Sequence, residues 1–381
     1  MTLFKRIWCI IVILALAASF TLAEEEEFSL KDIIYASLDD ESREQWDQWE
    51  AEETAWNSMD DEEQALLHLD RLPDASVDID PSELETNDKL PTDTVNILLL
   101  GLDSRKDVLN NGLSDVVMIL SFNKTDGSIK LTSILRDTYV SLPGYTQGNR
   151  INTAFRFGAI AGEKNNVADA GPKLAMRTVN RNFDMNIEHF VTVNIFGLAA
   201  IIDSLGGIDI ELTKAEANRI NYELRKEPMD KVKRSPVEGR AGMHHLDGMQ
   251  AVTFARIRGI DNDMARTERQ RKLMEVVLNH VLHNGLTLDG MVSLMETALP
   301  YIYTNIPPAM LFELGYAALS SGLLTRASHG ETLFSQFRIP MDKGFTYQNI
   351  DGMSVIFMSD RNKRLNLESL HQFIYGQAYL R

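Results

Sequence analysis

Residues 95 to 381 alternate between short apolar runs and amphipathic stretches, a pattern typical of an α/β fold. One apolar run continues without interruption up to Gly101, as expected of a strand that is buried on both faces. Asp126 and Gly127 predict a hairpin turn between the second and third strands. The strands expected from such patterns are residues 95–100, 115–123, 128–136, 189–195, 208–212 and 354–358.

Helical periodicity predicts helices that would cover this sheet. In the longest of them, Leu273 and Val277 belong to one apolar stripe. Residues 249–258 are expected to run from a short helical turn into a strand, VTFARIR. The pattern therefore predicts a mixed central sheet covered by helices. The helices expected are residues 170–183, 197–205 and 263–284.

The N-terminal segment, residues 1–23, has the layout of an export signal. Lys5 and Arg6 precede an uncharged apolar stretch, and small residues lead to an expected cleavage site after Ala23. The apolar run is about 17 residues long, at the lower limit for a membrane span. A cleaved signal peptide and a retained membrane anchor both remain open, and either would place the rest of the chain outside the cytoplasm.

Charge divides the remainder of the chain in two. The net charge is −17, but residues 24–94 contain 25 acidic and 4 basic side chains, whereas residues 95–381 contain 30 acidic and 32 basic ones. We therefore expect an acidic leader or linker at 24–94 and a nearly neutral folded domain at 95–381. The leader would serve as a solvated spacer, or as an arm that docks on a basic partner or on the protein's own active site. The single cysteine, Cys9, excludes a disulfide framework, a cysteine zinc site and a catalytic thiol in the domain.

Charged residues gather where the predicted strands begin or end. Ligand sites in open α/β sheets lie beyond the carboxyl ends of strands, so charged residues at these positions are candidates for a binding or catalytic site. Taken alone, each of these residues is equally consistent with a turn, a cap or a surface ion pair. The residues are Asp103, Arg105, Asp115, Arg136 and Asp137.

Further arginines suggest that these positions form one anion site. Arg256 and Arg258 would share one face of the expected strand, where burial is costly unless they are paired or bind an anion. Arg266 and Gln270 share one face of the expected helix. Guanidinium groups bind phosphate oxygens bidentately, so several of them suit a pyrophosphate. Two nearby carboxylates could also hold Mg²⁺.

These residues lie in seven blocks through which the chain resembles the LytR-CpsA-Psr family of bacterial cell-wall enzymes. The blocks occur in the family's order and cover most of residues 95–285, and the remainder fits the end of the same domain. They are NILLLGLDSR (96–105), NGLSDVVMIL (111–120), KLTSILRDTYVSLPG (130–144), RINTAFRFG (150–158), FVTVNIFGLAAIIDSLGGIDIEL (190–212), HLDGMQAVTFARIR (245–258) and DNDMARTERQRK (261–272).

The resemblance implies a three-layer domain and an extracytoplasmic phosphotransferase. Such an enzyme would attach a teichoic acid or capsule type glycopolymer, carried on undecaprenyl pyrophosphate, to peptidoglycan. It would act in the cell wall, secreted or anchored at the outer face of the cytoplasmic membrane, with the membrane surface as a further partner.

Site residues also follow from the resemblance. Asp103 and Asp115 would bind Mg²⁺ or another divalent cation. The resemblance does not settle which residue acts as a base for the acceptor hydroxyl, and Asp103 and Asp137 are both candidates. Arg136, Arg256 and Arg258 would also be catalytic. The residues that would hold the pyrophosphate are Arg105, Arg136, Arg150, Arg256, Arg258, Arg266 and Gln270. The residues that would line a lipid tunnel are Val117, Ile119, Phe155, Phe196 and Leu198.

The sequence departs from the family pattern in two blocks. Leu113 stands where the family commonly has a basic residue, and Leu135 replaces a proline. The same pocket would also support a polyprenyl-pyrophosphate hydrolase or a non-catalytic binder of polyprenyl lipid or glycan, so these alternatives remain open. A DNA-binding regulator is disfavoured, because the export signal places the domain outside and the domain has no large basic excess.

Overall fold

All described residues belong to one compact unit of the chain, residues 65–381. The expected signal segment and residues 24–82 of the expected leader lie outside the described residues, as do Asp103, Arg105 and Arg258. Within the described part, no helix combines the length and the hydrophobicity needed to cross a membrane. The computed structural model describes residues 83–102, 112–165, 167–225, 235–257, 260, 263–284, 301–323, 326, 329 and 334–381.

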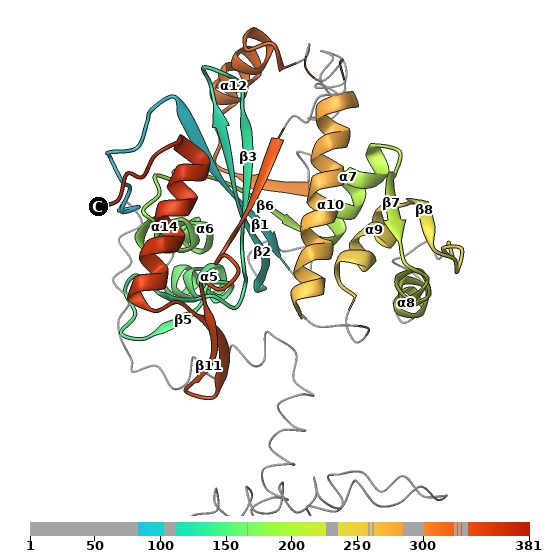
Figure 1. The fold of residues 1–381 in the computed structure, drawn as a ribbon, viewed down its shortest axis with the longest axis horizontal. Coiled ribbons are helices and arrows are strands. Elements are labelled where there is room, and N and C mark those ends of the chain that lie inside the picture. The colour runs from blue at the N-terminus through green and yellow to red at the C-terminus, as the bar shows by residue number, and fades with distance from the viewer. Residues whose placement is uncertain are drawn as a thin grey trace, which may run out of the picture. The chain divides into compact units, whose positions relative to one another are not determined.

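A mixed sheet of six strands forms the centre of the described fold (Figure 1). The pairs β1–β6 and β3–β10 are parallel and the other three pairs are antiparallel, as the sequence predicted for a mixed sheet. In spatial order the strands are β10 (Phe334–Ile339), β3 (Ile129–Ile134), β2 (Ser114–Asn123), β1 (Thr94–Leu102), β6 (His189–Asn194) and β9 (Ile302–Thr304).

The other described strands form three two-stranded antiparallel sheets outside this one. The strands expected at 208–212 and 354–358 are both present, but they belong to these small sheets. The small sheets are β4 (Tyr139–Ser141) with β5 (Gly148–Arg150), β7 (Ile208–Leu212) with β8 (Gly242–Leu246), and the hairpin of β11 (Thr346–Ile350) with β12 (Met353–Phe357).

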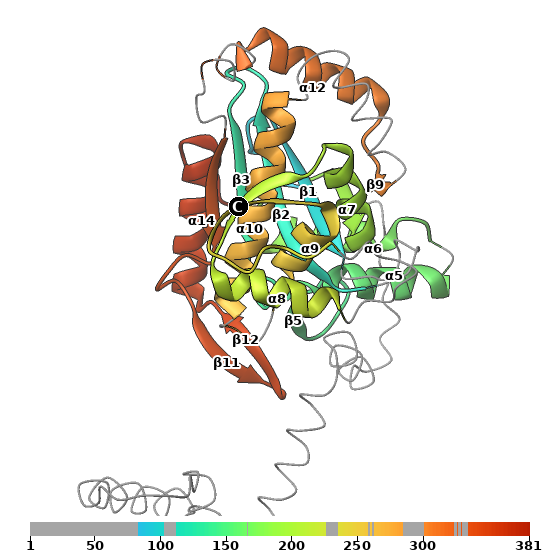
Figure 2. The ribbon, with the colours of Figure 1, turned by 90° about the vertical axis from the view of Figure 1, so that its right-hand side faces the viewer.

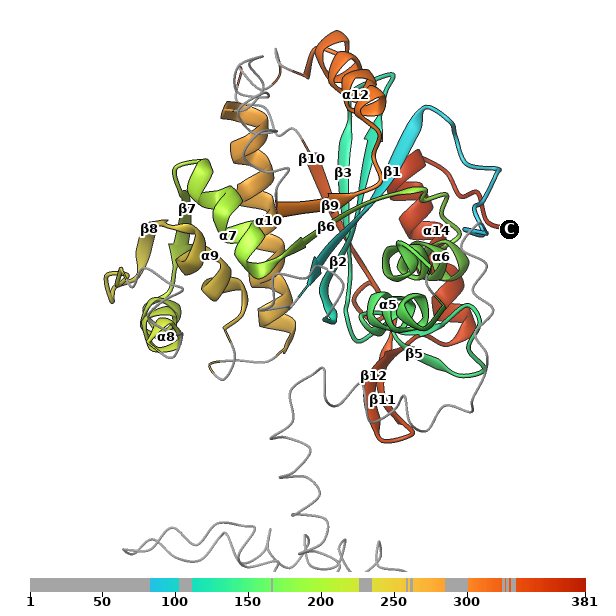
Figure 3. The same ribbon diagram turned by 180° about the vertical axis from the view of Figure 1, so that it is seen from behind.

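Helices cover both faces of the sheet, which gives the expected three layers (Figures 1 and 3). One face carries α5 (Thr153–Asn165), α6 (Ala170–Phe183) and α14 (Asp360–Tyr375). The other carries α7 (Ile195–Ser204), α9 (Gly248–Ala255) and α10 (Asp263–Asn284). The helix α8 (Lys214–Leu224) and the β7–β8 strand pair lie beyond these three helices. The helix α12 (Pro308–Ser320) lies at one end of the sheet (Figure 2).

The described residues form two hydrophobic clusters. On the α5–α6 face of the sheet, the sheet residue Ile119 and the helix residues Phe155 and Phe183 are completely buried in one cluster. The second cluster joins α7, α8, α9 and α10 to the β7–β8 pair.

The strand expected across residues 252–258 is wrong for its first part, because residues 252–255 belong to α9. Asp247 caps α9 by accepting a hydrogen bond from the backbone N–H of Gln250, and the Gln250 side chain accepts one from the Asp247 N–H. This reciprocal capping box starts a helix that packs in the second core, and packing outweighs the strand preference of Val252 and Thr253. Arg256 is consequently the residue that ends α9.

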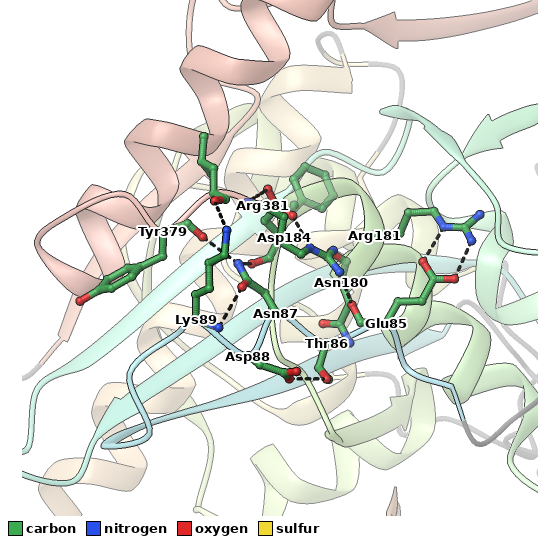
Figure 4. Close-up of polar contacts among 12 residues, drawn as sticks. Glu85, Thr86, Asn87, Asp88, Lys89, Asn180, Arg181, Asp184, Tyr379 and Arg381 are labelled. Atoms are coloured by element: carbon green, nitrogen blue, oxygen red, sulfur yellow. Dashed lines mark hydrogen bonds and ion pairs between the residues drawn. The ribbon is translucent and has the colours of Figure 1, made fainter.

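Residues 83–93, which were expected in the acidic leader, are instead fixed to the domain (Figure 4). The fully buried Asn87 donates a hydrogen bond from Nδ2 to the carbonyl oxygen of Tyr379 at 2.7 Å. The Glu85 carboxylate forms an ion pair with Arg181 at 2.5 Å. The domain therefore begins before residue 95, and this part of the chain does not act as a free spacer.

Candidate active site

Five charged side chains form a buried series of alternating sign, Arg266–Asp115–Arg136–Asp137–Arg150, which we call the arginine–aspartate chain. The Asp115 carboxylate forms an ion pair with Arg136 at 2.9 Å through Oδ1 and a second one with Arg266 through Oδ2. Asp137 lies 3.5 Å from the Nε atoms of both Arg136 and Arg150. Guanidinium groups fixed in this way can bind the oxygens of an anion such as phosphate.

Local structure brings these residues together from four elements. Asp115 opens β2, Arg136 follows β3, Arg150 ends β5 and Arg266 lies in the first turns of α10. The backbone of Asn152 ties two of these segments, because its N–H donates to Arg136 O at 3.2 Å and its carbonyl accepts from Ser114 N–H at 3.1 Å. The predicted convergence of Asp115, Arg136, Asp137, Arg150 and Arg266 is therefore observed.

An apolar pocket opens beside this chain on the α7–α9–α10 face of the sheet. It encloses about 490 Å³ of empty space, part of which is open to solvent. The polar side chains in its lining include Asp115, Arg256 and Gln270, while the rest of the wall is largely apolar. The lining residues are Gly101, Leu102, Asp115, Val116, Val193, Asn194, Ile195, Leu198, Val252, Ala255, Arg256, Gln270, Leu273 and Met274.

Arg256 reaches the site in a way that differs from the prediction. It lines the pocket from the end of a helix, so the argument from a shared strand face with Arg258 does not apply. Nearby Arg269 is directed elsewhere, since its Nη2 donates to the carbonyl of Ile257 at 3.0 Å. Arg269 thereby fastens the segment that follows Arg256 to α10.

Most of the side chains proposed for a lipid tunnel lie outside this pocket. Val117, Ile119 and Phe155 belong to the hydrophobic core of the opposite, α5–α6 face. Successive residues of a strand point to opposite faces, so Val116 lines the pocket and Val117 does not. Of the proposed residues only Leu198 is in the lining of the described pocket; Phe196 is half-buried on α7 and is not.

The magnesium site expected from Asp103 and Asp115 stays a prediction, because Asp103 lies outside the described residues. Asp115 is the predicted ligand that lies among them, and both of its carboxylate oxygens are occupied by arginine ion pairs. Nowhere in the described ranges do three His, Cys, Asp or Glu side chains gather as metal ligands. We therefore assign no reaction step to a metal ion.

Two kinds of pocket residue were missed from the sequence. Leu273 and Met274 lie in the apolar stretch of α10, which looked like ordinary core packing. Asn194 caps α7 by accepting from Gly197 N–H at 2.7 Å, and it also lines the pocket. A polar residue at the carboxyl end of a buried strand was the available signal for Asn194.

Comparison with known proteins places the chain in a family. Residues 67–363 match the model of the LytR_cpsA_psr family, so the chain belongs to the LytR-CpsA-Psr family. It is 30% identical over 268 residues to the polyisoprenyl-teichoic acid–peptidoglycan teichoic acid transferase TagU of Oceanobacillus iheyensis, covering 68% of this chain and 75% of that protein. It is 28% identical over 276 residues to TagU of Enterococcus faecalis, covering 71% and 78%.

The fold is also similar to that of solved structures. The structure of TagT bound to LI-WTA matches with a TM-score of 0.53 at 19% identity, over 76% of this chain and 96% of that one. The structure of TagV from B. subtilis matches with a TM-score of 0.53 at 19% identity, over 75% and 98%. At this level of identity the likeness supports the fold.

Proposed function

We propose that the protein transfers a glycopolymer from polyisoprenyl pyrophosphate to peptidoglycan, outside the cytoplasm. The observation that carries this proposal is an apolar pocket whose charged lining residues adjoin the arginine–aspartate chain. An amphiphilic donor, with a polyprenyl tail and a pyrophosphate, has the matching distribution of polarity. The names of the TagU relatives support the same substrate class.

In the proposed reaction, a hydroxyl oxygen of peptidoglycan attacks the phosphorus that carries the glycopolymer. A new phosphodiester P–O bond forms, the bridging P–O bond of the pyrophosphate breaks, and polyprenyl monophosphate leaves. Arg256, Arg136 and Arg266 would neutralise the charge that develops on the leaving phosphate. Asp115 would hold two of these guanidinium groups in place.

The hydroxyl proton requires an acceptor, for which Asp103 and Asp137 remain the candidates. Asp137 is described. Its carboxylate lies between Arg136 and Arg150 in the arginine–aspartate chain, and it is not among the residues that line the apolar pocket. Asp103 lies outside the described residues. A divalent cation remains an expectation from the family resemblance, as does attachment to the membrane.

The test is mass spectrometry of the full-length protein, offered a short-chain polyprenyl-pyrophosphate glycan, peptidoglycan fragments and Mg²⁺. Glycan linked to the fragment through a phosphodiester, absent with an Arg256→Ala, Arg266→Ala double variant, would support transfer. Free phosphorylated glycan without linked product would indicate a hydrolase. Lipid that is bound and unchanged would indicate a binding protein and would contradict the proposal.

A further inference from the structure

The β11–β12 hairpin has one buried strand and one exposed strand. Its turn, Asp351–Gly352, has positive φ angles at both residues, the conformation favoured in two-residue hairpins. Val355 of β12 is buried, whereas the β11 residues from Thr346 to Asn349 are all exposed. Tyr347 is 65% exposed although it is a large aromatic residue. A single exposed aromatic residue is common on protein surfaces, so the position of Tyr347 relative to the charged site has to carry the argument.

This hairpin is attached directly to the arginine–aspartate chain. The Ile356 N–H donates to the backbone carbonyl of Asp137 at 2.9 Å, and Arg150 Nε donates to the carbonyl of Ser354 at 3.0 Å. Figures 1 and 3 show the hairpin projecting at the end of the molecule where β2 and α10 begin. The strand β12 is therefore bonded to the site, and β11 is its antiparallel neighbour.

The hairpin and the apolar pocket contact different members of the arginine–aspartate chain. The pocket has Asp115 in its lining, whereas the hairpin bonds to Asp137 and Arg150. The attacking and leaving groups lie on different sides of the phosphorus, so donor and acceptor need separate surfaces. The pocket and the hairpin provide two such surfaces beside the same charged side chains.

The chemistry of β11 fits a sugar chain better than it fits an anionic polymer. The strand TYQNI contains no basic residue, and the turn adds the negative charge of Asp351. A phenol ring and an amide such as that of Gln348 offer the apolar surface and the hydrogen-bonding groups that a pyranose ring uses. Tyr347 packs edge-on against Phe345, with ring centroids 5.5 Å apart, so little rotamer freedom remains to be lost on binding.

We propose that β11 binds the acceptor glycan chain of peptidoglycan, with Tyr347 stacked against a sugar ring on the attacking side of the phosphorus. This inference rests on the proposed transferase function. It names a surface for the acceptor that is separate from the pocket for the donor lipid.

The test is titration of the full-length protein with a tetrasaccharide of the peptidoglycan glycan chain, without donor, followed by calorimetry. Tyr347→Ala is expected to weaken binding about tenfold, because one stacked ring is lost. Tyr347→Phe keeps the ring and should bind as the wild type does. Tyr316→Ala is the matched control, since Tyr316 is 73% exposed on α12, at the other end of the sheet.

Steady-state transfer kinetics provide the second readout. Tyr347→Ala should raise the KM for the acceptor and leave the KM for the donor unchanged. Unchanged tetrasaccharide affinity, an equal loss in Tyr316→Ala, or a changed KM for the donor alone would each overturn the proposal. Tetrasaccharide binding that depends on Tyr347, in a protein that forms no linked product, would preserve the surface and refute the transferase function instead.

Discussion

The two faces of the central sheet are built from similar apolar residues but have different packing. On the α5–α6 face, Ile119 and Phe155 are completely buried and belong to a continuous core. On the α7–α9–α10 face, the alternate residues of the same strands border a pocket of about 490 Å³. Apolar composition alone therefore does not reveal which face receives a ligand. The difference is marked by Arg256 and Gln270, which add polar groups to the lining of the pocket on one face only.

The largest expected effect is that of removing a cation from the pocket face. Arg256→Ala should lower kcat/KM for transfer by about 10²–10³-fold, the usual cost of losing one preorganised donor to a transition-state anion. Arg177→Ala is the matched control, because Arg177 lies on α6, on the opposite face of the sheet, and forms an ion pair with Glu85 at 2.8 Å. Transfer kinetics for both variants would test this. A loss of only a few-fold for Arg256→Ala, or equal losses for the two variants, would contradict the proposed site.

Two substitutions test which face of the sheet binds the lipid: one fills the pocket, and the other creates a cavity in the hydrophobic core of the opposite face. Ile119→Ala should destabilise the domain by about 2–5 kcal/mol and leave polyprenyl phosphate affinity unchanged, because Ile119 lies in the closed core. Leu198→Trp should weaken that affinity by occupying the pocket, with a smaller effect on unfolding. Chemical denaturation and lipid binding would measure both quantities. Loss of lipid affinity in Ile119→Ala alone would restore the original tunnel prediction.

Two roles are possible for the Asp115 carboxylate: it orients two arginines, or it binds Mg²⁺. If the carboxylate orients Arg136 and Arg266, Asp115→Asn should lower kcat/KM about 10–100-fold at every Mg²⁺ concentration, because charge-assisted hydrogen bonds are lost. If it ligates Mg²⁺, raising the Mg²⁺ concentration should recover part of the activity. Transfer rates measured across a Mg²⁺ titration distinguish the two. Recovery would show that the observed ion pairs rearrange when the cation binds.

Much of the fold could be predicted from periodicity, whereas the site could be predicted only in part. The bounds of α6 and α10 agree with the amphipathic patterns because helical periodicity over more than ten residues is a strong local signal. The strand predicted from residue 252 onward was wrong because the β-branched and aromatic residues there favour a strand locally, while tertiary packing and the Asp247 cap make residues 252–255 helical. The cap itself was readable from the sequence.

For the site, the position of charged residues at strand ends correctly predicted that Asp115, Arg136 and Arg266 converge. Their pairing could not be predicted, because it depends on how far α10 lies from β2. The face that holds the pocket could not be predicted either, since strand residues on both faces are apolar. Voids arise from the packing of whole helices, and no single residue such as Leu198 encodes one.

The smallest expected effect is a pH dependence of the stability of the fold, which arises on the α5–α6 face of the sheet. Burial lowers the pKa of His371 on α14, more than the Phe183 carbonyl and the charge of Asp184 raise it. The neutral ring fits its surroundings, because Nε2 lies 3.1 Å from Phe183 O and Nδ1 accepts from Tyr379 N–H at 3.2 Å. Protonation at Nδ1 would break the second bond. The group therefore stabilises the fold fully above the unfolded-state pKa of about 6.5, and this stability is lost as the pH falls toward the lower folded-state value.

Denaturation of wild type and His371→Gln between pH 7.5 and pH 5, a range of roughly one unit or more on either side of the unfolded-state value, would measure this. The wild type should lose stability below about pH 6.5, and the variant should lose less. His245→Gln is the control. The hydrogen bond that His245 donates to the Asp209 carboxylate raises the pKa of His245, so the small contribution of this group to stability is lost as the pH rises above about 6.5. The slope below that pH should therefore be unchanged in His245→Gln, and an equal flattening in both variants would show that His371 is not the responsible group.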